Sequence, residues 1–244
     1  MINFGAQYWT YYFESIFIRQ IDYFMGCLID RILPSLDTIE EEAKKIAEEE
    51  YERLNNLPAG PDDFIDPAEL AERAQDKAID YYIMMSSMKR GLVGLFTSGL
   101  YHLFEQQIFL FFNRGVLKYG EKEAIILPSE WKRLKIRFAN EGIELESFIS
   151  FQKIEILRLT SNVIKHAEGH SAEKLKQFKP EYFMPSNDLL ELGFPSPVKL
   201  QVRLPLAGED LNIPLDDFIQ YCEHIISFWR ELGEKLLEIE RRNI

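Results

Sequence analysis

Apolar residues recur at helical spacing along most of the chain. Residues 7–32 are apolar or aromatic on almost every side, which predicts a long helix that is buried or covered by a partner chain. Pro34 ends this helix, because proline lacks the amide that a helix interior needs. Residues 36–56 are polar apart from a thin apolar stripe and predict an exposed helical arm. These segments mark residues 1–56 as an N-terminal helical arm or a dimerisation element.

A second long helix follows a loop rich in proline and glycine. Asp66 is placed to cap this helix, and Pro67 suits its first position. We expect it to run from 67 to about 118, with three glycines as kinks or close-packing points: Gly91, Gly94 and Gly99. Further helices are expected over about 129–140, 144–168 and 171–178, and from 214 to the end. Gly169 suits the C-cap of the helix over 144–168.

One segment interrupts the helical pattern. Residues 198–204, VKLQVRL, and residues 210–213 flank a short polar turn, which predicts a small β-hairpin. The predicted fold is therefore mostly α, an antiparallel helical bundle with a small β-hairpin near 198–213. We expect residues 1–244 to form a single helical domain.

The composition is that of a soluble globular protein. Of the 244 residues, 46% are hydrophobic and 28% are charged, enough for a substantial core. The chain starts without a basic leader or a small-residue cleavage site and contains no long uncharged apolar run, so we expect a cytoplasmic protein without membrane partners. Cys27 and Cys222 lie in apolar helical patterns and are read as buried thiols.

Charge is distributed unevenly along the chain. The net charge of -12 argues against broad nonspecific binding to nucleic acid. Residues 36–80 hold 15 acidic and 5 basic residues, whereas residues 128–179 hold 10 basic and 7 acidic residues. The second segment is compatible with an anionic substrate or with an ordinary solvated face.

The basic segment carries a row of polar residues at steps of four: Arg158, Asn162 and His166. Each step turns only about 40° around a helix, so the three side chains share one face. Cleavage of RNA by its own 2′-hydroxyl needs a base, an acid and positive charge on the phosphate. An imidazole exchanges protons near neutral pH and a guanidinium binds phosphate, while Lys165 adds charge. The alternative is a polar helix face that bonds to the neighbouring loop.

Three other histidines need an explanation. His102 and Glu105 form a polar island in YHLFEQQIFLFF, where pairing with Arg158 or His166 would satisfy them, unless they lie on an exposed edge. His170 lies four residues after His166, but a metal site would need further ligands, so we expect no metal. His224 lies beside the apolar stripe of the last helix and is read as structural.

The row resembles a motif of the HEPN superfamily, helical domains that include many RNases of toxin–antitoxin and antiphage systems. That motif places an arginine a few residues before a histidine, often with an asparagine directly after the arginine. Asn162 and His166 are similar to its asparagine and histidine, and Glu105 to an acidic residue that some members carry on a facing helix. Here Ser161 precedes Asn162, and Arg158 lies further upstream.

The resemblance covers roughly 67–118 and 144–180. It implies a homodimer that cleaves RNA without a metal or cofactor. His166 would be the base or acid, Arg158 the phosphate clamp and Asn162 the orienting group, with support from four residues: Lys165, Glu105, His102 and His170. The alternative is a noncatalytic HEPN-like protein of a defence or toxin–antitoxin operon, which binds nucleic acid or a partner such as an antitoxin. A third option, a metal-dependent bundle enzyme, would contain bound metal.

Overall fold

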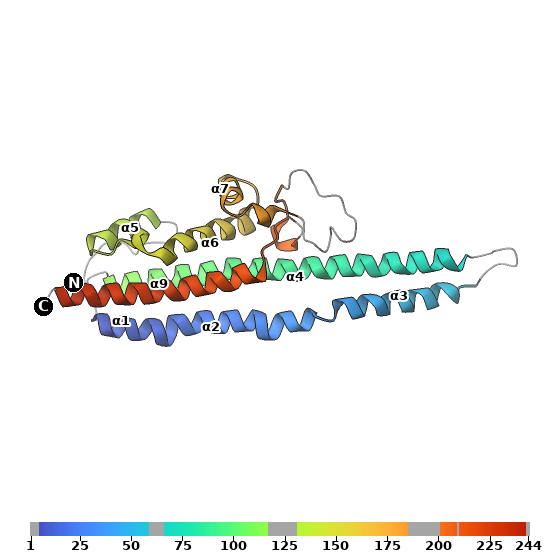
Figure 1. Ribbon diagram of the computed structural model, residues 1–244, viewed down its shortest axis with the longest axis horizontal. Coiled ribbons are helices and arrows are strands. Elements are labelled where there is room, and N and C mark those ends of the chain that lie inside the picture. Colours follow the sequence, from blue (N-terminus) through green and yellow to red (C-terminus); the bar gives the residue numbers. More distant parts are fainter. Residues whose placement is uncertain (1–4, 59–65, 117–130, 185–200, 209, 243–244) are drawn as a thin grey trace.

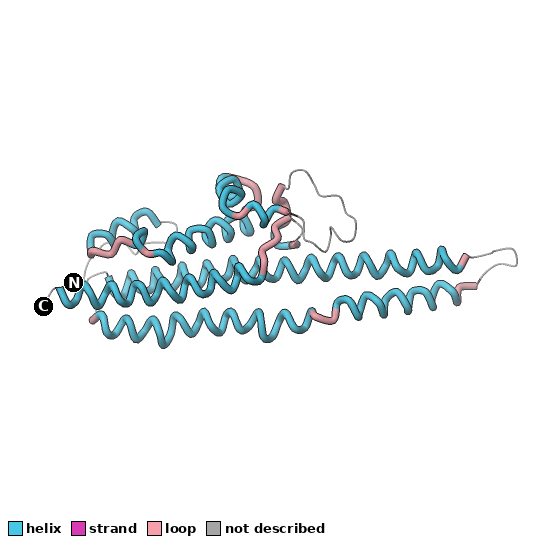
Figure 2. The backbone as a smooth tube through the Cα atoms, in the orientation of Figure 1, coloured by secondary structure: helices cyan, strands magenta, loops and turns pink. Residues whose placement is uncertain are grey.

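The computed structural model describes residues 5–58, 66–116, 131–184, 201–208 and 210–242. These residues form an all-helical fold that is drawn out along one axis (Figure 1). The backbone trace shows helices and loops, and the described residues contain no strand (Figure 2). The prediction of a mostly α fold is therefore confirmed.

The predicted first helix is present as one nearly continuous helical rod. Its segments are α1 (Ala6–Tyr12), the π-helical η1 (Phe13–Ile18), α2 (Arg19–Gly26), the π-helical η2 (Cys27–Ile32) and the 3-10 turn η3 (Leu33–Leu36). Trp9, Phe13 and Phe17 are buried against the last helix, α9 (Leu215–Arg242). The apolar character of this rod thus reflects its place in the core.

The exposed arm is a pair of helices. In Figure 1, α3 (Ile39–Asn55) runs beside the first half of α4 (Pro67–Phe111), beyond the end of the remaining helices. Asp66 caps α4 as predicted, because its carboxylate accepts a hydrogen bond from the Ala68 amide at 2.9 Å. Within the arm, Glu50 bonds Arg53 at 2.6 Å and Lys77 at 2.7 Å, which lowers the pKa of Glu50 to about 2.

The helical glycines serve close packing. Helix α4 continues through all three, and η4 (Phe112–Val116) extends it; residues 117–118 of the prediction lie outside the described residues. A Cβ on Gly91 would lie 2.1 Å from the Leu206 carbonyl oxygen, and one on Gly99 would lie 3.1 Å from Phe24. Close packing is therefore confirmed at both positions.

The body contains the second half of α4, the first-helix rod and α9, with α6 (Ile149–His166) packed against both α4 and α9. Two shorter elements, α5 (Trp131–Asn140) and η6 (Leu145–Ser147), lead into α6. Residues 129–130, where the α5 prediction began, lie outside the described residues. The final helix, α9, is confirmed, and Trp229 is at the centre of its buried face.

A buried amide joins three helices at this centre. The Gln107 side chain donates to the Phe17 carbonyl at 3.1 Å and to the Gln20 side chain at 2.9 Å, and it accepts from Trp229 Nε1 at 2.9 Å. These bonds explain why a polar residue occurs in the apolar part of α4.

Replacing Gln107 with leucine should lower the free energy of unfolding by about 1–3 kcal/mol, because it leaves buried polar groups unsatisfied. Chemical denaturation of wild type and Gln107→Leu measures this difference. The exposed neighbour Gln106 provides the control, since Gln106→Leu should change stability by less than about 0.5 kcal/mol. Equal stability of Gln107→Leu and wild type would contradict the role of the buried amide.

The β-hairpin predicted near 198–213 is wrong for the described residues. Residues 198–200 lie outside them, and the remainder forms a 3-10 turn, η8 (Pro205–Ala207), flanked by irregular backbone. The Asp210 carboxylate accepts hydrogen bonds from the backbone amides of Arg203 and Leu204. In a β-hairpin, the second strand would bind such amides instead. Pro205 itself has no amide to donate.

The junction after α6 also differs from the prediction. Helix α6 ends at His166, and its C-cap is Ala167, with φ 58°, instead of Gly169. Gly169 instead precedes α7 (His170–Phe178), with φ 151°. Ser171 therefore lies within the first turn of α7. In the described part of the chain, no helix is both long and apolar enough to cross a bilayer.

Candidate functional site at the junction of α6 and α7

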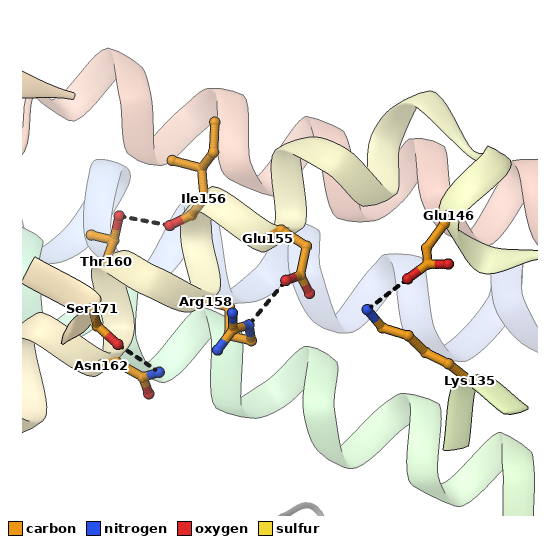
Figure 3. Close-up of polar contacts among 8 residues, drawn as sticks. All are labelled: Lys135, Glu146, Glu155, Ile156, Arg158, Thr160, Asn162 and Ser171. Carbon is orange, nitrogen blue, oxygen red and sulfur yellow. Dashed lines mark hydrogen bonds and ion pairs between the residues drawn. The ribbon is translucent and has the colours of Figure 1, made fainter. Parts of the chain in front are cut away.

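The predicted row lies on α6 because the opposite face of that helix is buried. Leu157, Thr160 and Val163 are fully buried, and the Thr160 hydroxyl donates to the Ile156 carbonyl at 3.0 Å. Figure 3 shows Arg158 and Asn162 on the same side of α6, with Thr160 pointing elsewhere. The step of four therefore gives Arg158 and Asn162 the shared face that it predicts.

Arg158 has a carboxylate partner on its own helix. Its Nε donates to Glu155 Oε2 at 3.2 Å, and both side chains are about one-third exposed (Figure 3). Glu155 offsets part of the positive charge, but the four remaining N–H donors of a guanidinium can still bind an anion.

Asn162 reaches toward α7. Its Nδ2 lies 3.5 Å from the hydroxyl oxygen of Ser171, at the limit of a hydrogen bond (Figure 3). This contact matches the alternative in which the row bonds to the segment that follows α6. The amide is half-buried, so its orientation is set between the two helices.

His166 is the last residue of α6, and its imidazole is exposed. Among the described residues, this imidazole has no hydrogen-bond or ion-pair partner. Lys165 is also exposed, and its Nζ lies 5.9 Å from the centre of the Tyr101 ring. His170 opens α7 and is exposed, with Nδ1 4.0 Å from a Glu173 oxygen. Two accessible imidazoles therefore flank the α6–α7 turn.

His102 fits the interpretation as an exposed edge. Its Nδ1 lies 3.5 Å from Glu105 and its Nε2 lies 3.0 Å from Gln106, so both contacts are within α4. Of the two alternatives for His102, an exposed edge or pairing with Arg158 or His166 across the bundle, these contacts match the first. Glu105, which is mostly buried, stands on α4, the helix that packs against α6.

The burial of Ser161 gives a physical reason why no arginine directly precedes Asn162, in contrast to the HEPN-like pattern. Ser161 is fully buried, and its hydroxyl lies 3.1 Å from the Ser98 hydroxyl of α4. An arginine at this position would point into the α4–α6 interface. The arginine of this helix is instead Arg158, one turn before Asn162 and partly exposed.

The sequence analysis missed a polar cluster that holds the segment after α6 in place. Asp217 of α9 accepts from Lys179 at 2.7 Å and from the Tyr182 hydroxyl at 2.5 Å; Tyr182 belongs to η7 (Pro180–Phe183). The Tyr182 and Tyr221 hydroxyls lie 2.8 Å apart. Burial opposes the charge on Lys179, but the bond to Asp217 raises the pKa of this amine overall. In the sequence, Tyr182 lies outside the expected helices, so no periodic pattern marked this cluster.

Glu168 forms a second anchor beside His166. Its carboxylate accepts from the Val202 amide at 2.7 Å and from Lys176 at 3.1 Å. Partial burial works to raise the pKa of Glu168, but these two donors lower it on balance. The segment directly after His166 is therefore fixed to the segment around Val202.

No family model, curated protein or solved structure matches this chain. The candidate site therefore rests on its own residues.

The two cysteines and His224 differ in burial. The thiol of Cys222 is buried as predicted, which raises its pKa to about 12, whereas Cys27 is only half-buried, contrary to the prediction. Burial lowers the pKa of His224. Within the described ranges, no three His, Cys, Asp or Glu side chains gather as they would around a metal ion.

Proposed function

We propose that the protein is a HEPN-like, metal-independent endoribonuclease of the cytoplasm that acts in phage defence or a toxin–antitoxin system. The main support is the exposed imidazole of His166, which has no partner among the described residues and follows Arg158 and Asn162 on α6. Such an imidazole is accessible to a substrate and to solvent protons. The reaction requires no cofactor.

In the proposed reaction, His166 removes the proton from an RNA 2′-hydroxyl, and the resulting oxygen attacks the adjacent phosphorus. The bond to the 5′-oxygen breaks, and that oxygen takes a proton from a second group. His170, at the start of α7, is the candidate for this acid. The free donors of Arg158 would bind the nonbridging oxygens, and Asn162 would orient the phosphate or the imidazole. The products are a 2′,3′-cyclic phosphate and a 5′-hydroxyl.

His166→Ala should reduce cleavage of a mixed RNA pool by at least about 100-fold, the usual contribution of a general base or acid. The assay contains EDTA, and analysis of the RNA ends identifies the cyclic phosphate. Gln152→Ala, an exposed change on the same helix, is the matched control and should retain full activity. Undiminished cleavage by a folded His166→Ala variant would overturn the assignment.

A noncatalytic interaction protein is the second candidate. Tyr11 and Tyr23 of the first-helix rod are 72% and 76% exposed, whereas Trp9, Phe13 and Phe17 of the same rod are buried. Tyrosine is enriched at protein interfaces, because it combines apolar area with a polar end. The ion pair of Arg158 with Glu155 also suits this alternative. Failure of the folded wild type to cleave any RNA would favour it.

A further inference from the structure

Helix α7 carries a second row of exposed side chains: His170, Lys174 and Phe178. They follow one another at steps of four, so they share one face of the helix and span roughly 12 Å along it. The opposite face holds Ala172 and Leu175, which are fully buried. In Figure 1, α7 lies on the side of α6 that faces away from α4. The row therefore faces solvent, because the rest of α7 packs on the body.

Phe178 is the member of this row whose exposure is costly. The residue is 57% exposed, although burial of an aromatic side chain is favourable. A single exposed apolar residue is ordinary on a protein surface, but Phe178 lies one turn from a cation. In the described part of the chain, the Lys174 amine has no hydrogen-bond or ion-pair partner. This face thus combines an accessible positive charge with an accessible aromatic ring.

Helix α7 is held in place on the body. Lys176 bonds Glu168 at 3.1 Å, and its Nζ lies 5.0 Å from the centre of the Phe183 ring. At the end of α7, Lys179 bonds Asp217 of α9 at 2.7 Å. These contacts fix the direction in which the row points. A surface that is ordered before binding loses less conformational entropy when a ligand arrives.

A cation and an aromatic ring on one face match the chemistry of single-stranded RNA. The ammonium group binds a backbone phosphate, and the ring stacks on a base. In a duplex the bases already stack on each other, so only an unpaired base can lie on an aromatic side chain. Each step of four advances roughly 6 Å along α7, which is comparable with the separation of neighbouring nucleotides in an extended strand. The row begins at His170, across the α6–α7 turn from His166, so it adjoins the candidate site.

We propose that this face of α7 binds unpaired RNA, with a phosphate on Lys174 and a base stacked on Phe178. The inference rests on the proposed nuclease function, since it extends the site at His166 along α7. The row begins at His170, the candidate acid for the leaving 5′-oxygen. That oxygen belongs to the nucleotide on the 3′ side of the cut, so the stacked base also lies on the 3′ side. The protein therefore selects RNA that is unpaired downstream of the bond that it cuts.

Binding of an RNA oligomer that is 2′-O-methylated throughout tests the stacking without any cleavage. Fluorescence anisotropy gives the Kd of the single strand and of the same oligomer in a duplex. Wild type should bind the single strand more tightly. Phe178→Ala should weaken single-strand binding by at least about 5-fold, the usual loss for one stacked base, whereas Phe178→Trp should retain it. Tyr23→Ala is the matched control and should bind as wild type does, because Tyr23 is also exposed but lies on the first-helix rod.

Lys174→Ala gives an independent readout, the dependence of binding on salt. Loss of one phosphate contact should reduce the slope of log K against log salt by about 0.7, the value for one phosphate of a single strand. Lys44→Ala, an exposed change on the acidic α3, should leave this slope unchanged. Circular dichroism confirms that each variant is folded.

Two results would overturn the proposal. One is a folded wild type that binds no single-stranded RNA. The other is a Phe178→Ala variant that binds as tightly as wild type, which would assign Phe178 to another contact, such as a partner protein. Cleavage that depends on His166 would then leave the proposed function standing. Conversely, binding that depends on Phe178 in a protein that cleaves no RNA would support the stacking and refute the nuclease.

Substrates that lack a single base test the direction of the strand. Removal of a base on the 3′ side of the cut should lower kcat/KM for wild type but not for Phe178→Ala, whereas removal on the 5′ side should affect both proteins equally. Equal effects of the 3′ removal on the two proteins would contradict the assignment to the 3′ side. A wild type that cleaves no RNA would overturn this direction together with the proposed function.

Discussion

Trp229→Ala should lower the free energy of unfolding by about 3–5 kcal/mol, the cost of truncating a large core side chain. Trp229 is fully buried, and its ring centre lies 4.8 Å from that of Phe13 and 4.6 Å from that of Phe17. The substitution removes packing between α9 and the first-helix rod and also the hydrogen bond to Gln107. It therefore weakens three helices together.

Urea denaturation followed by circular dichroism measures this change. Trp229→Phe keeps an aromatic ring at the site and should retain much of the stability that alanine loses. A change below about 1 kcal/mol for Trp229→Ala would contradict the position of Trp229 at the centre of the core.

Asp217→Ala should lower the free energy of unfolding by about 2–4 kcal/mol. It removes the carboxylate that accepts hydrogen bonds from one charged and one neutral donor in a mostly buried cluster. The lost bonds are those from Lys179 and Tyr182, and the Tyr182 hydroxyl is left beside Tyr221. Burial is the main cause that raises the pKa of Tyr182, so this residue stays neutral and serves as a donor. The segment after α6 should loosen from α9.

Asp217→Asn is the matched control, since it retains an acceptor for Tyr182 and should lose less stability. Hydrogen exchange of the α7 amides reports whether this segment loosens, and unchanged exchange in Asp217→Ala would contradict the anchoring role. The pKa of Lys179 is raised above 10.5 in the folded protein, so the stability that its bond to Asp217 contributes is fully present below that pH. It should be lost as the pH rises through the higher folded-state value.

The helices could be predicted because their apolar periodicity is strong. The cap at Asp66, the end near Pro34 and the long α4 followed from local chemistry that does not depend on the rest of the fold. The shared face of Arg158 and Asn162 followed from helical geometry in the same way. The place of the first-helix rod in the core could not be decided, since burial and coverage by a partner produce the same apolar pattern.

The predictions of the β-hairpin and of the C-cap at Gly169 were wrong because contacts with residues elsewhere in the chain determine the backbone at these places. Alternation over 198–204 suggested a strand, but Asp210 binds the backbone amides of this segment instead. The backbone reversal after α6 occurs at Ala167 instead of Gly169, where Glu168 fixes the turn to Val202. Such contacts leave no periodic signal in the sequence. The same holds for the cluster around Asp217.

The most direct test of the proposed chemistry compares two RNA oligomers of the same sequence, incubated with wild type in EDTA. One has free 2′-hydroxyls, and the other is 2′-O-methylated throughout. The account predicts that only the first is cut, with 2′,3′-cyclic phosphate ends, because the 2′-oxygen is the nucleophile and His166 takes its proton. Cleavage of both oligomers, or ends without a cyclic phosphate under conditions that preserve it, would contradict the account.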